Sequence, residues 1–415
     1  MKLFLLEVKR MFRIKRVCIL YILSFVLSIW LAYLPITFES INIVDKNGNS
    51  TKLNGIEAVE YKKEMQEAIT GIVTPQNVRM AVEECQKVFY EYGVHDYYEL
   101  PDDVYVNRIL PFVPLIKGVR EIYADPETGI APDILELYPE EVEDYYKKCD
   151  EWIVELMRIE QKDNPKAQNF AVRKYYSVDK PYMYYPGITR NAMDYQVLLA
   201  FVLLIFSAVI AAPIFSYDYQ TGANEIFRST KHGHKYFGNI RILASIVICS
   251  SMYLICMAIY LLMSNTLFGW ESTKTSIQIL YSIVNLPNLN MGEMQIAVVF
   301  LGFISVCASV VLNLFFSAIN KNIIVSLSLG FLLSIMPLLI YIMFPDKIEA
   351  WINCILPSGG LCPQMGYLYS LVDFQFLTFG KLVVWRPYLM IVFAMVEIPI
   401  FWGATIYSYI RYKEK

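Results

Sequence analysis

The chain has 415 residues, of which 56% are apolar and only 18% charged, and its formal net charge is −3. This composition differs from that of ordinary soluble domains and predicts an all-α polytopic membrane protein. The sequence contains no G-x-x-x-x-G-K-[ST] phosphate loop, no His-Glu-x-x-His pattern and only three His. Catalytic residues, a metal site, a bound cofactor and nucleic-acid binding are therefore not predicted for this chain.

The N-terminal arm, residues 1–16, has the pattern of a cytoplasmic amphipathic helix that lies on a membrane surface. Its apolar residues share one helical face and basic residues flank them; the apolar set is Phe4, Val8, Met11 and Phe12. Residues 17–36 follow as the first predicted transmembrane helix. This apolar run is longer than the core of a secretory signal, and no small-residue cleavage site follows it.

Residues 37–193 are predicted to form a large, mainly helical extracellular domain between transmembrane helices 1 and 2. They contain 28 Asp or Glu and 18 Lys or Arg, a net charge of −10 that leaves +7 for the rest of the chain. Such a surface attracts cationic ligands, or is simply a solvated face. Apolar residues recur at helical spacing after Pro75 and after Pro139, and weaker helical patterns cover residues 56–70 and 165–176.

Two cysteines, Cys85 and Cys149, lie in this stretch, each on the apolar face of a predicted helix. They are a candidate disulfide in an oxidising exterior, or two buried free thiols. Cys354 and Cys362 are a second candidate pair. No CxxC motif or His cluster indicates a metal site.

Five further segments are long enough and apolar enough to cross a bilayer as helices of about 20 residues; they are residues 194–216, 240–264, 293–318, 322–344 and 387–410. Lys and Arg gather in the N-terminal arm, in residues 217–239 and in the tail 411–415. The positive-inside rule therefore places both termini and the 217–239 loop in the cytoplasm. Residues 345–386 are too apolar for a free loop, and we expect an extracellular segment that can re-enter the membrane, buried against protein.

Polar residues inside the predicted spans have two interpretations. Glu397 is the clearest intramembrane acid, and a charge at that depth costs about 2.5–3.5 kcal/mol on insertion scales. It either belongs to a transport pathway or is a neutral acid hydrogen-bonded between helices. Ser309 and Asn313 lie on a stripe of small and polar residues, which indicates close helix packing or the polar wall of a pathway.

The loop between the second and third spans contains the most informative motif. Thr221-Gly222 is suited to end the helix that leaves the second span, because Gly adopts the left-handed conformation found at helix ends. Residues 224–229 then predict a short helix along the membrane face. Ile226 and Phe227 are unusual in a solvated loop, so we expect them to bury in a partner or against the ends of the spans. An ordinary positively charged loop is the plain alternative.

This loop resembles the coupling segment in the membrane subunits of bacterial ABC exporters of the ABC-2 type. That segment has an acidic or aromatic residue, a Thr-Gly or similar pair, a helix ending near Ser-Thr-Lys-x-Gly, and a basic residue entering the third span. The matching residues are Tyr217, Asp218, Thr221, Gly222, Ile226, Ser229, Thr230, Lys231, Gly233 and Lys235. The resemblance extends to the number and order of the six spans.

The resemblance implies a non-catalytic permease subunit of an exporter in the bacterial cytoplasmic membrane. It implies a separate ABC ATPase dimer that binds ATP and Mg, and a second permease subunit, identical or related. The implied ATPase contact consists of Thr221, Gly222, Asn224, Glu225, Ile226, Phe227, Arg228, Ser229, Lys231 and Gly233. The substrate, whether peptide, drug, lipid or ion, is not readable from the sequence. Two other functions fit the same residues: a membrane-anchored peptide sensor or immunity protein without transport, and an ion-coupled secondary transporter that uses Glu397.

Overall fold

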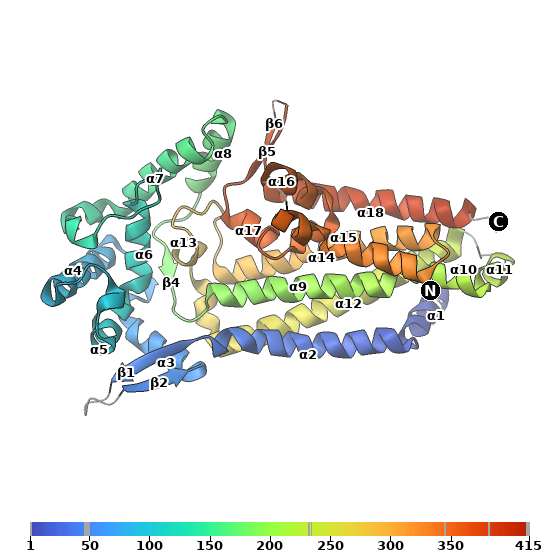
Figure 1. Ribbon diagram of the computed structural model, residues 1–415, viewed down its shortest axis with the longest axis horizontal. Coiled ribbons are helices and arrows are strands. Elements are labelled where there is room, and N and C mark those ends of the chain that lie inside the picture. The colour runs from blue at the N-terminus through green and yellow to red at the C-terminus, as the bar shows by residue number, and fades with distance from the viewer. Residues whose placement is uncertain are drawn as a thin grey trace.

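A computed structural model describes residues 2–44, 50–230, 233, 235–343, 346–380 and 382–411, without the side chains of Arg228, Asp346 and Lys347. The chain is mainly helical, at 75% of its residues. Figure 1 shows a bundle of long helices with a body of shorter helices at one end. The N- and C-terminal helices reach the opposite end, which we call the terminus end.

Six helical segments in the described part of the chain are long enough and apolar enough to cross a membrane. They are α2 (Lys15–Thr37), α9 with α10 (Arg190–Ala211 and Ser216–Thr221), α12 (Lys235–Phe268), α14 (Met291–Ile319), α15 (Ile323–Met343) and α18 (Arg386–Arg411). By helix length and hydropathy the chain is therefore a multi-pass membrane protein, and the six spans predicted from the sequence are confirmed.

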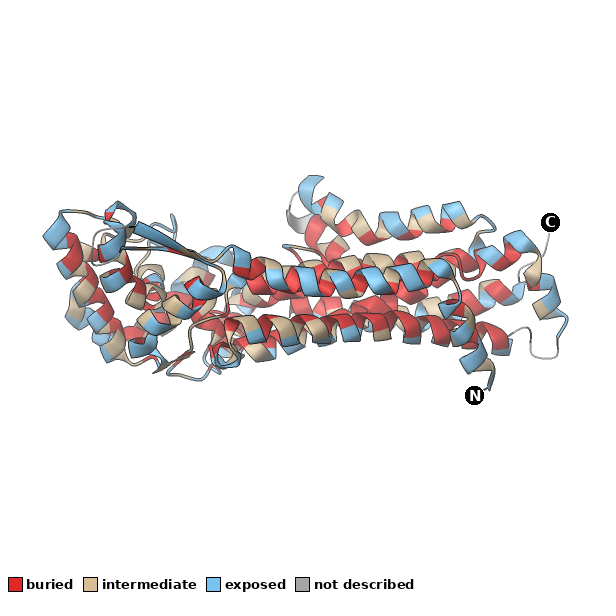
Figure 2. Cartoon of the chain, turned by 90° about the horizontal axis from the view of Figure 1, so that it is seen from below, coloured by how far each residue is buried: buried red, intermediate tan, exposed pale blue. Residues whose placement is uncertain are grey.

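The six long helices differ in how much of their apolar surface the protein covers. Most of α9 and α14 is buried, whereas α2, α15 and α18 leave most of their apolar residues uncovered. Figure 2 shows the buried face turned inward and the exposed face following the outside of the bundle. On α2, for example, Ile19, Ile22 and Val26 are all more than half exposed. Such outward apolar faces are suited to contact with lipid.

Small residues let the central helices approach closely. A Cβ atom added at Gly330 of α15 would overlap the amide oxygen of Asn313 on α14. One added at Gly238 of α12 would lie 2.9 Å from Cδ1 of Ile406 on α18. Close backbone contact at small residues is a common way for membrane helices to associate.

The helical body consists of residues 38–189 and the loops that pack on them. Its helices and short helical turns are α3 (Ile56–Met65), η1 (Glu67–Ile69), α4 (Pro75–Tyr92), η2 (Tyr97–Glu99), α5 (Asp102–Val104), η3 (Tyr105–Ile109), η4 (Leu110–Phe112), α6 (Val113–Ile122), η5 (Ile134–Glu136), η6 (Pro139–Asp144), α7 (Tyr145–Glu160) and α8 (Pro165–Tyr175). The helix predicted after Pro75 is confirmed, and Thr74 and Asn77 begin it with a reciprocal capping box. After Pro139 the chain first makes a 3₁₀ turn and becomes α-helical only at Tyr145.

The hydrophobic core of this body is shared with later parts of the chain. Between α12 and α14 lie η7 (Trp270–Lys274) and α13 (Ile277–Leu280), and this region contributes Ile277 and Val284 to the core. Leu368 and Trp385, which precede α18, join the same core. The sequence pattern predicted a separate domain at residues 37–193. The packing does not separate these residues from the rest of the chain as a domain.

The described residues also form three two-stranded antiparallel sheets: β1 (Ser40–Val44) with β2 (Ser50–Asn54), β3 (Gly71–Ile72) with β4 (Met183–Tyr184), and β5 (Phe376–Phe379) with β6 (Leu382–Trp385). In these ladders Ser40 lies opposite Asn54, Gly71 opposite Tyr184 and Phe376 opposite Trp385.

The segment before α18 folds back against the bundle. It consists of α16 (Asp346–Ile355), η8 (Pro357–Leu361), α17 (Tyr367–Val372) and the β5–β6 hairpin. Every residue of η8 is buried, and η8 contacts α9, α14, α15 and α18. Ser358 donates a hydrogen bond to the carbonyl oxygen of Leu333, 2.8 Å away on α15. Burial against protein lets an irregular segment of this kind lie beside membrane spans.

Candidate functional site at the terminus end

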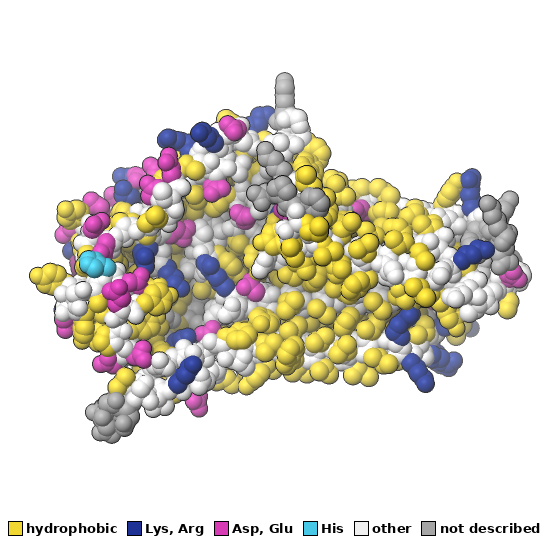
Figure 3. Space-filling model, in the orientation of Figure 1, with side chains coloured by type: hydrophobic (Ala, Val, Ile, Leu, Met, Phe, Trp, Pro, Cys, Tyr) yellow, Lys and Arg dark blue, Asp and Glu magenta, His cyan; other side chains and the backbone are white. Residues whose placement is uncertain are grey.

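The segment that carries the sequence motif lies at the terminus end, close to the N-terminal helix. Figure 1 places α10, α11 (Ala223–Arg228) and α1 (Lys2–Phe12) at this end. Figure 3 shows a hydrophobic belt over the long helices, with Lys and Arg side chains beyond it at the terminus end and mixed charges on the helical body. This arrangement is typical of a protein whose belt lies in a bilayer.

The predicted helix break at Gly222 is present in the structure. Gly222 has a φ of +71° and a ψ of 0°, the left-handed conformation, and it separates α10 from α11. No atom lies within 4 Å of the position that its Cβ would occupy, so backbone conformation and not space favours glycine here. The short helix predicted over residues 224–229 corresponds to α11.

The two apolar residues of α11 have different surroundings. The Phe227 ring lies 4.9 Å from the ring of Phe237 and 5.1 Å from the guanidinium of Arg241, both at the start of α12. Ile226, in contrast, is 71% exposed. Of the pair expected to bury, Phe227 packs against the chain's own helices, and Ile226 is left facing outward.

Beside α11 lies a cluster of four charged side chains, Glu7, Arg10, Asp218 and Arg241, which we call the Arg241 cluster; all but Arg10 are buried. The Arg241 side chain is 1% exposed; it pairs with Asp218, and its Nε lies 3.4 Å from Oε1 of Glu7. Arg10 lies 2.5 Å from Glu7 and 3.6 Å from Asp218. Two cations thus balance two buried anions, and a buried charge without a partner would be costly.

The Arg241 cluster connects three elements that are far apart in the sequence. Glu7 and Arg10 belong to α1, Asp218 to α10 and Arg241 to α12. The ring of Phe227 adds α11 through its contact with the Arg241 guanidinium. Phe227 thus connects α11 to a cluster that α1, α10 and α12 share.

Sequence reasoning missed Glu7. The signal was present, because Glu7 lies three residues after Phe4 and four before Met11, in the middle of the apolar face of a basic amphipathic helix. An acid in that position needs a buried cation, and Arg241 is the cation that the structure supplies.

The remaining residues of the predicted contact lie around α11. Asn224 is buried, while Thr221, Glu225 and Ser229 are exposed. The carbonyl oxygen of Gly233 accepts a hydrogen bond from Tyr409 of α18, at 2.9 Å. Lys231 and the side chain of Arg228 fall outside the described residues.

The polar residues predicted within the spans do not form one site. Ser309 and Asn313 are buried on α14, where Nδ2 of Asn313 donates to the Ser309 carbonyl oxygen at 2.7 Å. Glu397 is half-buried on α18, and its Oε2 atom has no hydrogen-bond partner among the described residues. In the same part of the chain, no hydrogen bond or ion pair joins Glu397 to either α14 residue.

The cysteines are free thiols in the structure. Cys85 and Cys149 are almost completely buried in the shared core of the helical body. Burial raises the pKa of the Cys85 thiol to about 12, so it is protonated and unreactive at neutral pH. Cys354 and Cys362 are also buried and free. No group of three His, Cys, Asp or Glu in the described ranges is arranged to hold a metal ion.

No protein-family model matches the chain, and a search of curated proteins also finds no match. The chemistry and geometry of the residues are therefore the guide to function.

Proposed function

We propose that this chain is the permease subunit of an ATP-driven exporter of the ABC-2 type in a bacterial cytoplasmic membrane. Both termini and α11 lie in the cytoplasm, and the helical body lies outside the cell. A separate ATPase dimer binds ATP and Mg and performs the hydrolysis, so this chain is not itself an enzyme. A second permease subunit, identical or related, completes the transporter.

The observation that carries the proposal is the two-sided character of α11. One side is fixed to α12 through Phe227, which contacts Phe237 and Arg241. The other side presents Ile226, an apolar side chain that is 71% exposed. A short helix that is held firmly and offers an apolar anchor is suited to dock in a groove of a partner protein.

The Arg241 cluster supplies the mechanical connection that a power stroke needs. When the ATPase dimer closes on nucleotide, it displaces α11, and the contact of Phe227 with Arg241 passes that displacement to α12. Asp218 and Glu7 pass it to α10 and α1. The long helices then tilt as rigid bodies, which opens a path between the two permease subunits.

Co-purification tests this proposal. The tagged chain, purified from native membranes in mild detergent, is expected to retain a protein with a phosphate-loop sequence, identified by mass spectrometry. Replacing Ile226 with Asp should reduce that protein several-fold, because a charge replaces the apolar anchor. The matched control is Ile130→Asp, since Ile130 is 69% exposed and lies in the helical body. Equal retention of the ATPase by both variants would refute the contact, and the absence of any ATPase would refute the proposal.

A second candidate, ion-coupled transport, is favoured by one observation, the Oε2 atom of Glu397 that has no partner among the described residues. Reconstituted vesicles distinguish the two functions. Transport that continues without ATP, collapses with the proton gradient and is lost in Glu397→Gln would favour the ion-coupled mechanism. Transport that requires ATP and the partner ATPase would favour the exporter.

A further inference from the structure

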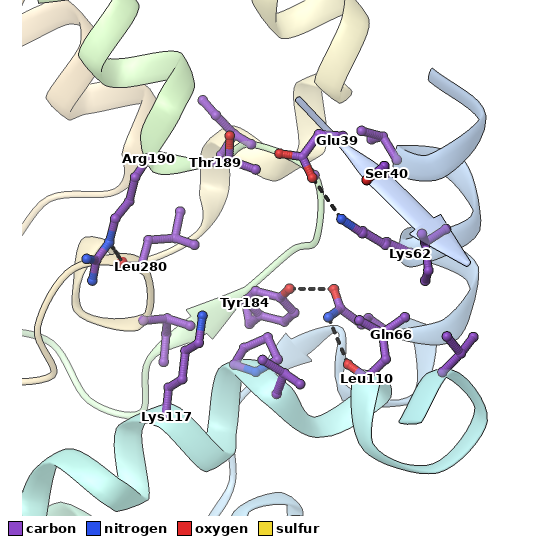
Figure 4. Close-up of a pocket in the computed structure, with 18 of the residues that line it drawn as sticks. Glu39, Ser40, Lys62, Gln66, Leu110, Lys117, Tyr184, Thr189, Arg190 and Leu280 are labelled. Carbon is purple, nitrogen blue, oxygen red and sulfur yellow. Dashed lines mark hydrogen bonds and ion pairs between the residues drawn. The ribbon is translucent and has the colours of Figure 1, made fainter. Parts of the chain in front are cut away.

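A cavity of about 740 Å³ lies where the helical body meets the ends of α2 and α9. Its walls come from β1 and β2, from the region of α3, from residues 102–121 (α5 to α6), from residues 184–190 (β4 to the start of α9) and from residues 278–281 around α13. Figure 3 shows charged side chains in a hollow between the body and the hydrophobic belt, and Figure 4 shows the cavity itself. Its volume is within the range of about 300–1,000 Å³ that is usual for small-molecule sites.

The acidic side chains of the cavity are all engaged by the protein. Glu39 pairs with Lys62, with 2.9 Å between Oε2 and Nζ. Glu121 accepts a hydrogen bond from the backbone N–H of Ile283 at 3.0 Å and another from the hydroxyl of Ser282. Asp102 accepts one from the side-chain amide of Asn42 at 3.0 Å. These bonds hold all three carboxylates in place, and the lining has four basic side chains, Lys52, Lys62, Lys117 and Arg190, against these three acids.

Positive charge in the same cavity is not balanced. Arg190 donates from Nε and Nη2 to the carbonyl oxygens of Leu280 and Tyr281, which are neutral partners. Lys117 extends from α6 into the cavity (Figure 4), and no ion pair or hydrogen bond engages its amine among the described residues. Lys52 of β2 also lines the cavity. Among the described residues, no acidic side chain forms an ion pair with Arg190. Its guanidinium and the Lys117 amine are therefore available to an anion.

The position of the cavity indicates where that anion comes from. Glu39 follows the end of α2, and Arg190 begins α9, so the cavity is level with the ends of two candidate membrane spans. Phe38 and Tyr195 contact each other nearby, with 5.8 Å between ring centroids, and aromatic pairs are typical of the headgroup level. Apolar side chains complete the walls, including Val59, Leu110 and Ile188.

We propose that this cavity binds the phosphate headgroup of an anionic phospholipid, with Lys117 and Arg190 beside the phosphate and the apolar wall against the glycerol and upper acyl carbons. Each Lys or Arg near an anionic lipid surface contributes about 1 kcal/mol of attraction. The inference goes beyond the proposed transport and does not depend on it, because none of the residues that line the cavity belongs to α10 or α11. The chain should therefore bind the lipid even in the absence of an ATPase.

Native mass spectrometry of the full chain tests the proposal. The protein is exchanged into micelles that contain equal amounts of phosphatidylglycerol and phosphatidylcholine with the same acyl chains, and the retained lipids are counted. Wild-type protein should retain phosphatidylglycerol in preference. Lys117→Gln should weaken that retention about fivefold, the effect expected of one basic group near an anionic headgroup, and leave phosphatidylcholine unchanged. Lys52→Gln, a second variant of the lining, should act in the same direction.

The control is Lys87→Gln, since Lys87 is on α4 and does not line the cavity. Retention by this variant should equal that of the wild type. Equal retention of the two lipids by wild-type protein would overturn the proposal, and so would identical behaviour of the Lys117 and Lys87 variants. Displacement of the lipid by an equal concentration of glycerol 3-phosphate, or of an acidic tetrapeptide, would also overturn it, because the ligand would then be a soluble anion.

Discussion

Replacing Arg241 with Met removes a buried cation that two anions share. The Asp218 and Glu7 side chains are 3% and 4% exposed, so water cannot replace the lost partner. Arg10 remains 2.5 Å from Glu7 and 3.6 Å from Asp218, but it leaves one cation for two anions. Breaking a buried ion pair from one side costs about 3–5 kcal/mol. Because Arg10 compensates in part, we expect a loss near the lower end of that range, about 3 kcal/mol in the free energy of unfolding.

The assay is equilibrium unfolding in mixed micelles, followed by the loss of helical circular dichroism. Two variants isolate the charge effect. Arg10→Met should cost less, about 1 kcal/mol, since that side chain is 34% exposed and its ion pairs are partly screened. The triple variant Arg241→Met, Glu7→Gln, Asp218→Asn should recover most of the stability, because it leaves no unpaired charge inside the cluster. The reasoning is refuted if Arg241→Met costs no more than Arg10→Met, or if the triple variant is as unstable as the single one.

Three further predictions concern backbone conformation, protonation and thiols. Gly222→Ala should lower the free energy of unfolding by about 1 kcal/mol, and so should the control Gly129→Ala, since Gly129 has a φ of +70°. Only the Gly222 variant should also uncouple ATP hydrolysis from export. Equal export activities of the two variants would contradict this. Burial raises the pKa of Glu121 above its ordinary value of 4.5, although bonds from Ser282 and Ile283 oppose the shift. Between the unfolded and folded pKa values of Glu121, the folded chain binds more protons than the unfolded chain, so the free energy of unfolding should fall as pH rises above about 4.5. Glu121→Gln should remove that part of the pH dependence. A pH dependence that the substitution leaves unchanged would count against the assignment. Cys85 and Cys149 should resist a maleimide in the folded protein and both react after denaturation without reductant, whereas a need for reductant would reveal a disulfide.

The sequence predicted the features that depend on neighbouring residues. The six spans follow from apolar runs, and the left-handed turn at Gly222 follows from the chemistry of glycine at a helix end. The start of α4 was readable from Pro75, which is favoured in the first turn of a helix.

Features that depend on distant residues were not predictable in this way. The partner of Glu7 is 234 positions away in Arg241, and no periodicity relates the two. The core of the helical body includes Trp385, which follows the fifth span in the sequence, and counting the residues between the first two spans could not show this. The cavity is lined by Lys117 and Arg190 from separate segments, and only the three-dimensional packing reveals it.

Cross-linking from position 226 is the most direct test of the central claim, that a separate ATPase drives this chain through α11. Cys18 is the one exposed native cysteine, so Ile226→Cys is made together with Cys18→Ser and labelled with a photoactivatable maleimide in native membranes. The account predicts an adduct with a phosphate-loop ATPase, and none from Ile130→Cys in the same background. Labelling of the Ile226→Cys variant by a membrane-impermeant maleimide added outside intact cells would contradict it.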